Sequence, residues 1–228
     1  MGLRVVLIEG GEGGGKTTAA KHLEAEYGFK YIKLPTPGSD YEKIIFSNIK
    51  DNYVRAAVAS RDMEVRFEEL ENDSTQYRGV VLDRGPLSTF SYQGTKEAAI
   101  ALKAFGYKIV TSITDVLVLD IDPEIGLNRE VKKNAFSEKD LHFHLNVNRK
   151  MRQMGFYLED IARDNKDTES MSSQDRYFCG PLSYDADKDP LKNALANLFT
   201  GVRNAHVIDV NNTTVAEGIE ACVKALNL

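Results

Sequence analysis

Residues 10–17 read GGEGGGKT and directly follow an apolar run, VVLI at residues 5–8. The stretch matches the pattern G-x-x-x-x-G-K-[ST], whose last three positions are Gly15, Lys16 and Thr17. Glycines adopt positive φ angles without strain, so successive backbone N–H groups of such a loop can face an anion. We therefore predict a phosphate-binding loop between a buried strand and a helix over residues 18–27, whose N-terminus points at the anion.

Five short apolar runs are separated by helix-like sequence. They cover residues 4–9, 29–34, 79–83, 115–121 and 206–210. Buried parallel strands have this appearance, and their alternation with helices favours right-handed crossovers. We predict an α/β fold, namely a three-layer, doubly wound parallel sheet of about five strands of the P-loop NTPase type. Ligands of such sheets bind at the carboxyl ends of the strands.

Nothing resembling a linker divides the 228 residues, so we predict a single domain over residues 1–228. Residues 164–189 are rich in Asp, Ser and Lys and have little periodicity, which indicates a long surface excursion. Leu191, Leu195 and Leu198 then suggest a short helix before the last strand. We therefore predict an insertion over about residues 164–204.

Composition limits the function classes. A net charge of −5 argues against a nucleic-acid polymer as partner, and no apolar run is long enough to cross a bilayer. The first expected strand begins by Arg4, which leaves no room for a signal peptide, so we expect a cytoplasmic protein without membrane association. Cys179 and Cys222 are unpatterned and are interpreted as ordinary thiols.

The third expected strand ends in VVLDR, which delivers Asp83 and Arg84 to the sheet edge near the phosphate loop. Asp83 can order Mg²⁺ or its water ligands. Arg84 can hold phosphate oxygens through its planar guanidinium group. This pairing beside a phosphate loop is what phosphoryl transfer requires.

Several ordered segments resemble the thymidylate kinase branch of the nucleoside monophosphate kinases. They are IEGGEGGGKTT at residues 8–18, KLP at 33–35, ASR at 59–61, DRGPLSTFSYQG at 83–94 and LDIDPEIGLNR at 119–129. The resemblance covers about residues 3–163 and 205–226. It implies Mg²⁺- and ATP-dependent phosphorylation of a deoxynucleoside monophosphate by direct in-line transfer, with dTMP to dTDP as the first choice. The homodimers of the relatives suggest a homodimer here.

The resemblance also assigns residues around the donor. Lys16 would stabilise the transferred phosphoryl group, Thr17 and Asp83 would bind Mg²⁺, and Arg84 would hold the acceptor phosphate and the transition state. Glu12 occupies an acidic loop position near the acceptor sugar. The loop has no arginine, so a helical lid over about residues 129–145 would supply the cation from Arg129, Lys132 or Lys133. ATP would contact Gly10, Gly13, Gly14, Gly15, Lys16, Thr17 and Thr18.

The acceptor site follows from the same resemblance. Arg61 and Thr89 would face the edge of the base, and Tyr92 would exclude a 2′-hydroxyl. The full acceptor set comprises Glu12, Pro35, Arg61, Arg84, Ser88, Thr89, Tyr92 and Gln93.

Two departures leave the base open. Ala57 replaces the usual stacking aromatic, for which Phe67 or Phe46 would have to substitute, and Pro35 is followed by Thr36 and Pro37 rather than Glu and Arg. Another or modified deoxynucleoside monophosphate is therefore an alternative acceptor. A deoxynucleoside kinase that uses Glu12 as general base is a second alternative, and a non-catalytic P-loop nucleotide-binding protein is a third.

Overall fold

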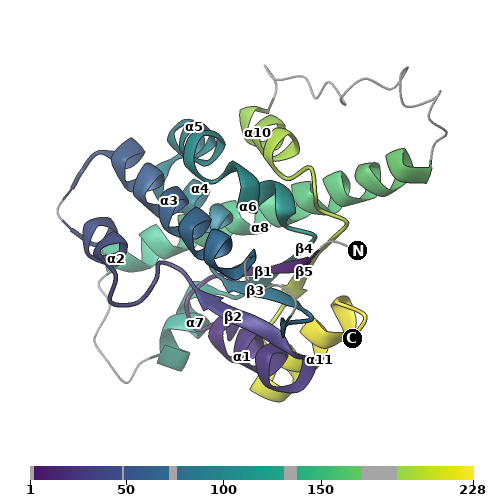
Figure 1. The fold of residues 1–228 in the computed structure, drawn as a ribbon. Coiled ribbons are helices and arrows are strands. Elements are labelled where there is room, and N and C mark those ends of the chain that lie inside the picture. Colours follow the sequence, from purple (N-terminus) through teal and green to yellow (C-terminus); the bar gives the residue numbers. More distant parts are fainter. Residues whose placement is uncertain (1–2, 48, 72–75, 131–137, 171–188) are drawn as a thin grey trace.

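The computed structural model describes residues 3–47, 49–71, 76–130, 138–170 and 189–228. These residues form one parallel sheet in the order β2-β3-β1-β4-β5 (Figure 1). Each run predicted to be a strand is one, with boundaries within two residues of the expected ones. The strands are β1 (Arg4–Gly10), β2 (Phe29–Lys33), β3 (Gly79–Asp83), β4 (Asp115–Asp120) and β5 (Asn204–Asp209). The predicted α/β fold is confirmed.

Helices cover both faces of the sheet and make three layers (Figure 1). On one face lie α1 (Lys16–Tyr27), α7 (Pro123–Glu130) and α11 (Val215–Ala225). The other face carries α3 (Asn52–Glu71), α4 (Pro86–Gln93), α5 (Thr95–Phe105), α6 (Tyr107–Ser112), α8 (Glu138–Ser170) and α10 (Pro190–Leu198). The short helix α2 (Asp40–Ile45) packs against α3.

The sheet has one hydrophobic core on each face, and the side chains of β1 alternate between them. Val5 and Leu7 pack with the α3 to α10 layer, whereas Val6 and Ile8 pack with α1 and α11. All four side chains are fully buried. Because successive residues of a strand point to opposite faces, a strand covered on both sides must be apolar throughout, as this one is.

Strand register brings two loops to the same edge of the sheet. β1 lies between β3 and β4, and Ile8 pairs with Asp83. The backbone N–H of Arg84 donates to the carbonyl of Ile8 over 3.0 Å. The glycine-rich loop after β1 and the Asp83–Arg84 pair therefore leave the sheet side by side, at the position where doubly wound sheets bind ligands.

The structure differs from the sequence prediction in two places. Helix α1 begins at Lys16, two residues earlier than expected, because Gly15 in the left-handed region (φ 86°) serves as its N-cap. The range of the expected insertion, about 164–204, begins inside the 33-residue helix α8 and reaches the first residue of β5. The short helix suggested by the three leucines is α10; Asp189 caps its N-terminus, and the leucines are buried in the core. Residues 171–188 lie outside the described part of the chain.

No helix in the described ranges combines the length and the apolar character needed to cross a membrane. The long helix α8 contacts the core through only part of its surface.

Candidate active site

The glycine-rich loop is shaped by contacts that leave no space for a side chain. Gly13 has a φ of 70°, and a Cβ atom there would lie 2.1 Å from the carbonyl oxygen of Gly126 in α7. Gly10 has a φ of 141°, and its Cβ would lie 2.3 Å from the carbonyl oxygen of Leu119 in β4. The loop is thus held against β4 and α7, so its backbone conformation is set before any ligand binds.

Lys16 is almost completely buried at the start of α1, with 6% of its surface exposed. Its ammonium group donates to the carbonyl oxygen of Gly11 over 2.5 Å. Burial, and next the positive charge of Arg84, lower the pKa of Lys16 to about 8. Asp83, Glu9 and Glu12 offset only part of this burial, so the negative charge of phosphate oxygens would further stabilise the charged form of Lys16.

Asp83, at the end of β3, accepts hydrogen bonds from two hydroxyl groups. The Thr17 hydroxyl donates to its carboxylate over 2.5 Å, and the Tyr31 hydroxyl donates over 3.1 Å. Burial and the neighbouring charge of Asp83 raise the pKa of Tyr31 to about 12, so the phenol keeps its proton. The oxygen atoms of Thr17 and Asp83 are hard ligands of the type that Mg²⁺ prefers.

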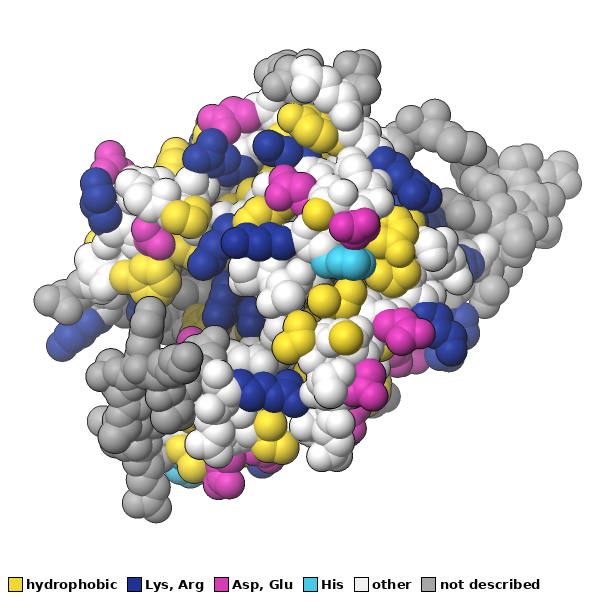
Figure 2. Space-filling model, turned by 90° about the horizontal axis from the view of Figure 1, so that it is seen from below, with side chains coloured by type: hydrophobic (Ala, Val, Ile, Leu, Met, Phe, Trp, Pro, Cys, Tyr) yellow, Lys and Arg dark blue, Asp and Glu magenta, His cyan; other side chains and the backbone are white. Residues whose placement is uncertain are grey.

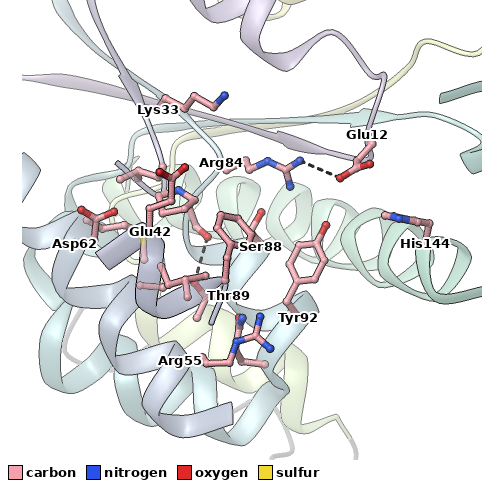
Figure 3. Close-up of a pocket in the computed structure, with 18 of the residues that line it drawn as sticks. Glu12, Lys33, Glu42, Arg55, Asp62, Arg84, Ser88, Thr89, Tyr92 and His144 are labelled. Atoms are coloured by element: carbon pink, nitrogen blue, oxygen red, sulfur yellow. Dashed lines mark hydrogen bonds and ion pairs between the residues drawn. The ribbon is translucent and has the colours of Figure 1, made fainter. Parts of the chain in front are cut away.

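Two cavities open on either side of this centre. The first, of about 630 Å³, is lined by residues 13–19 of the loop, by Asp83 and Arg129, and by the segment that joins β5 to α11. The second, of about 420 Å³, lies between α2, α3, α4 and the start of α8 (Figure 3). Among the described residues, Lys33 and Arg84 alone line both cavities. The two cavities therefore meet at a pair of cations.

Arg84 is positioned by its backbone and by two neighbours. Its φ of 71° lies in the left-handed region that non-glycine residues rarely adopt. Its guanidinium group lies 3.9 Å from the carboxylate of Glu12 (Figure 3) and also interacts with the hydroxyl of Tyr92. Burial raises the pKa of Tyr92, and Arg84 partly opposes that change. Unusual backbone conformations of this kind are concentrated at functional sites.

Glu9 is a fully buried acid that the sequence analysis did not select. Its carboxylate accepts from the backbone N–H of Ser88 over 2.9 Å and from the Ser88 hydroxyl over 2.7 Å. Burial raises the pKa of Glu9, while Ser88, Arg84 and Lys16 lower it. Ser88 lies in the first turn of α4, so Glu9 satisfies an N–H group at that terminus and ties α4 to β1. Sequence reasoning could have selected Glu9, because it is an acidic residue directly after the apolar residues 5–8 of β1.

Seven of the eight residues predicted for the acceptor line the second cavity. They are Glu12, Pro35, Arg84, Ser88, Thr89, Tyr92 and Gln93. Most residues predicted to bind ATP line the first cavity, namely Gly13, Gly14, Gly15, Lys16, Thr17 and Thr18. Gly10 does not line it and packs against Leu119 of β4.

Arg61 is the exception, and the prediction that it faces the base is corrected. Its side chain is half exposed and lies 3.7 Å from Glu68 on the surface of α3. The cavity wall is formed instead by Arg55, Ala59, Asp62 and Met63. These positions share one side of the helix, whereas a residue two positions from Ala59 points elsewhere. Helical periodicity was therefore the signal that could have selected Arg55.

The two aromatic residues considered for base stacking lie in different places. Phe67 is buried in the core, whereas Phe46 lines the second cavity and is 70% exposed. Phe143 lines the same cavity, with its ring centre 5.9 Å from that of Tyr92. An aromatic surface is thus present there despite Ala57.

Arg129 has a structural task in this conformation. Its guanidinium group donates to the carbonyl oxygens of Val210 at 2.9 Å, Asn211 at 3.1 Å and Thr213 at 3.1 Å. It thereby fixes the loop that walls the first cavity. Lys132 and Lys133, the other lid candidates, lie outside the described residues. On the face shown in Figure 2, lysine and arginine side chains gather around a hollow, a charge pattern suited to anionic ligands.

A parallel sheet, a glycine-rich loop that leads into a helix, and an Asp-Arg pair beside it define a P-loop kinase. A family described as an AAA domain matches residues 5–176. The thymidylate kinase of Clostridium novyi (strain NT) is 31% identical over 176 residues, which cover 67% of this chain and 83% of the relative. The chain belongs to the thymidylate kinase family and is a phosphotransferase.

Solved structures share the fold. The thymidylate kinase of Ehrlichia chaffeensis has a TM-score of 0.57 at 16% identity, and the alignment covers 99% of this chain and 100% of that one. A deoxyadenosine kinase from M. mycoides, solved with dCMP and dCDP bound, has a TM-score of 0.53 at 16% identity, with 98% of both chains covered.

Proposed function

We propose that this kinase transfers the γ-phosphoryl group of ATP to the phosphate of a deoxynucleoside monophosphate, with dTMP as the preferred acceptor. The observation that carries the proposal is the junction of the two cavities at Lys33 and Arg84. Transfer between two phosphates brings several negative charges together, so it requires cations where the two ligands meet. A cavity for an uncharged acceptor would not need that pair of cations.

In this mechanism an oxygen of the acceptor phosphate attacks the γ-phosphorus in line, and the bond to the bridging oxygen of ADP breaks. Lys16 exchanges its contact with Gly11 for the phosphates of ATP and follows the charge of the transferred group. Arg84, together with Lys33, holds the acceptor phosphate in line and neutralises the charge that develops. The reaction needs no covalent enzyme intermediate.

The residues at the loop fit Mg²⁺. Thr17 and Asp83 would hold the ion together with phosphate oxygens and water, and the ion would neutralise charge on the transferring group. The described residues contain no group of three or more His, Cys, Asp or Glu that could bind a metal by themselves. That finding accords with Mg²⁺ arriving with ATP, because Mg²⁺ typically takes one or two protein ligands and completes its shell with phosphates and water.

Further roles belong to the same proposal. Tyr92, half-buried beside Arg84, would lie under the sugar and exclude a 2′-hydroxyl, with Glu12 on the opposite side. A lid over about residues 129–145 would close on ATP and exclude water, with Lys133 as its cation and Arg129 anchoring the adjacent loop. The homodimer and the cytoplasmic location remain predictions.

A coupled assay of ADP release tests the proposal directly. The acceptors are dTMP, dUMP, dCMP, dAMP, dGMP and thymidine, each with ATP and Mg²⁺. We expect dTMP to give the highest kcat/KM and thymidine to be inert. The fold shared with the deoxyadenosine kinase makes thymidine the essential comparison. If thymidine is phosphorylated and dTMP is not, the acceptor is a hydroxyl and the phosphate assignment is wrong.

A further inference from the structure

Three glycines of the glycine-rich loop are in close contact with their surroundings, and at one of them the neighbour is a side chain. A Cβ atom at Gly10 would lie 2.3 Å from a backbone carbonyl oxygen, and one at Gly13 would lie 2.1 Å from another. A Cβ atom at Gly11 would instead lie 2.4 Å from Nδ2, 2.6 Å from Oδ1 and 2.8 Å from Cγ of Asn148. The position of Gly11 therefore depends on one side chain of helix α8.

Asn148 is itself held in place by burial and by a hydrogen bond. The residue has 9% of its surface exposed. Its Nδ2 atom donates to the carbonyl oxygen of Ile121, directly after β4, over 2.8 Å. A carboxamide has one donor end and one acceptor end, so this bond fixes the orientation of the whole group. The Asn148 amide thus joins the end of β4 to the loop that leaves β1.

Gly11 in turn is connected to two cations of the site. Its carbonyl oxygen accepts from the ammonium group of Lys16. The next residue is Glu12, whose carboxylate lies 3.9 Å from the guanidinium group of Arg84. A rotation of the peptide between Gly11 and Glu12 would displace both partners. The cations on the ATP side and on the acceptor side are therefore both sensitive to the position of Gly11.

Helix α8 also forms part of the acceptor cavity. Phe143 and His144 line that cavity, and Figure 3 shows His144 on the side where Glu12 and Tyr92 lie. Asn148 follows His144 by four residues, so it lies one helical turn further along the same side of the helix. The contact with Gly11 thereby fixes the phosphate loop relative to one wall of the acceptor cavity.

We propose that Asn148 is a positioning residue for phosphoryl transfer, which fixes Gly11 and thereby places Lys16 and Arg84 relative to the two substrates. The inference rests on the proposed function, because it takes the loop as the ATP site. Asn148 lines neither cavity, so it acts through the loop and not on a substrate. In-line transfer demands such placement, since a displacement of about 1 Å can cost about 100-fold in rate.

The test compares two asparagines of α8 that each donate to a backbone carbonyl oxygen. Asn148→Ala removes the contact with the loop and the bond to Ile121. Asn165→Ala, near the other end of the helix, removes a bond of 2.9 Å to the carbonyl of Val202. For both variants and the wild type, kcat, the KM for ATP, the KM for dTMP and Tm are measured.

We expect Asn148→Ala to lower kcat roughly 10- to 100-fold and to change both KM values by less than about threefold. The reason is that the placement of the cations matters most when charge develops between the phosphates. Asn165→Ala should also lower Tm but keep the wild-type kcat, as expected for an asparagine whose role is structural only.

A change on the loop side tests the contact itself. Gly11→Ala should lower kcat, because the new methyl group would meet the Asn148 amide. In the Asn148→Ala background that space is vacated, so the double variant should turn over faster than Gly11→Ala alone. Residues in contact show such non-additivity. Gly11→Ala also keeps the test decisive if Asn148→Ala does not fold.

A wild-type kcat in either folded single variant would overturn the inference. Losses that simply multiply in the double variant would do so as well, because Gly11 and Asn148 would then act independently. If the wild type phosphorylates thymidine and not dTMP, the proposed acceptor is wrong, and the same variants are compared with thymidine. Failure of the wild type with every acceptor would instead reject the proposed function itself.

Discussion

Replacing Lys16 with methionine should stabilise the protein and stop catalysis at the same time. The ammonium group is buried against one carbonyl oxygen, and burial with the charge of Arg84 lowers its pKa from 10.5 to about 8. That difference corresponds to about 3 kcal/mol of penalty on the charged form. Methionine keeps the length of the side chain and removes the charge, so the penalty disappears.

The net gain is smaller than the penalty, because the carbonyl oxygen of Gly11 loses its donor. The penalty already covers the charge, so what remains to be lost is the hydrogen bond of a neutral amine, about 1 kcal/mol, which leaves a gain of about 2 kcal/mol. For a chain of this size, 1 kcal/mol moves Tm by about 2–4 °C, so we expect Tm to rise by about 4–8 °C without nucleotide. Turnover should fall by about 10³-fold, because the cation that follows the transferring charge is absent.

The dependence on pH provides an independent check. Lys16 titrates near pH 8 in the folded state and near 10.5 when unfolded, so between these values the unfolded state binds more protons. Wild-type stability should therefore rise with pH across this window, relative to the variant. The advantage of Lys16→Met is complete below about pH 8 and disappears towards pH 10.5.

Chemical denaturation and differential scanning calorimetry at pH 7 and pH 10 measure these changes, with ADP release as the activity readout. Lys21→Met, which alters an exposed lysine of the same helix, is the matched control and should change neither Tm nor turnover. If Lys16→Met lowers Tm at pH 7 or retains turnover, the electrostatic reasoning about the loop is wrong.

Three further changes probe other parts of the site. Gly13→Ala should destabilise the protein by more than about 2 kcal/mol in urea denaturation, since φ is 70° and the Cβ would meet the carbonyl of Gly126; unchanged stability would contradict the loop geometry. Arg129→Met should raise the KM for ATP roughly tenfold and leave that for dTMP unchanged, because three carbonyl contacts of the ATP-side loop are lost; an effect on dTMP alone would refute this role. Lys33→Met should lower kcat/KM for every monophosphate by roughly 10- to 100-fold without altering base selectivity, and wild-type rates would remove Lys33 from the transfer point.

Much of the fold could be predicted because local chemistry and tertiary structure agree. A strand buried on both faces must be uniformly apolar, and VVLI before the glycines, like VVL before Asp83, has that composition. Asp83 ends β3 and Arg84 follows it, while Lys16 and Thr17 begin the helix after the short loop that leaves β1. Their position at the sheet edge therefore came from chain connectivity.

Side-chain direction on helices was harder to predict. Arg55 and Arg61 are six residues apart on α3, and a resemblance in sequence order does not say which of them faces the cavity. Lys33 lines both cavities, and that position depends on how β2 packs beside the glycine-rich loop, which no local pattern contains. Glu9 has its partner, Ser88, 79 positions away. Long-range partners of this kind are fixed by the packing of α4 on β1, which no local pattern contains.

The most direct test of the central claim is binding of a single molecule that carries adenosine and thymidine at the two ends of a pentaphosphate chain. If the ATP and acceptor cavities meet at Lys33 and Arg84, this compound should bind one per chain, more tightly than ATP or dTMP alone, and compete with both substrates. Competition with ATP alone, at an affinity no better than that of ATP, would show that the second cavity does not hold the acceptor phosphate.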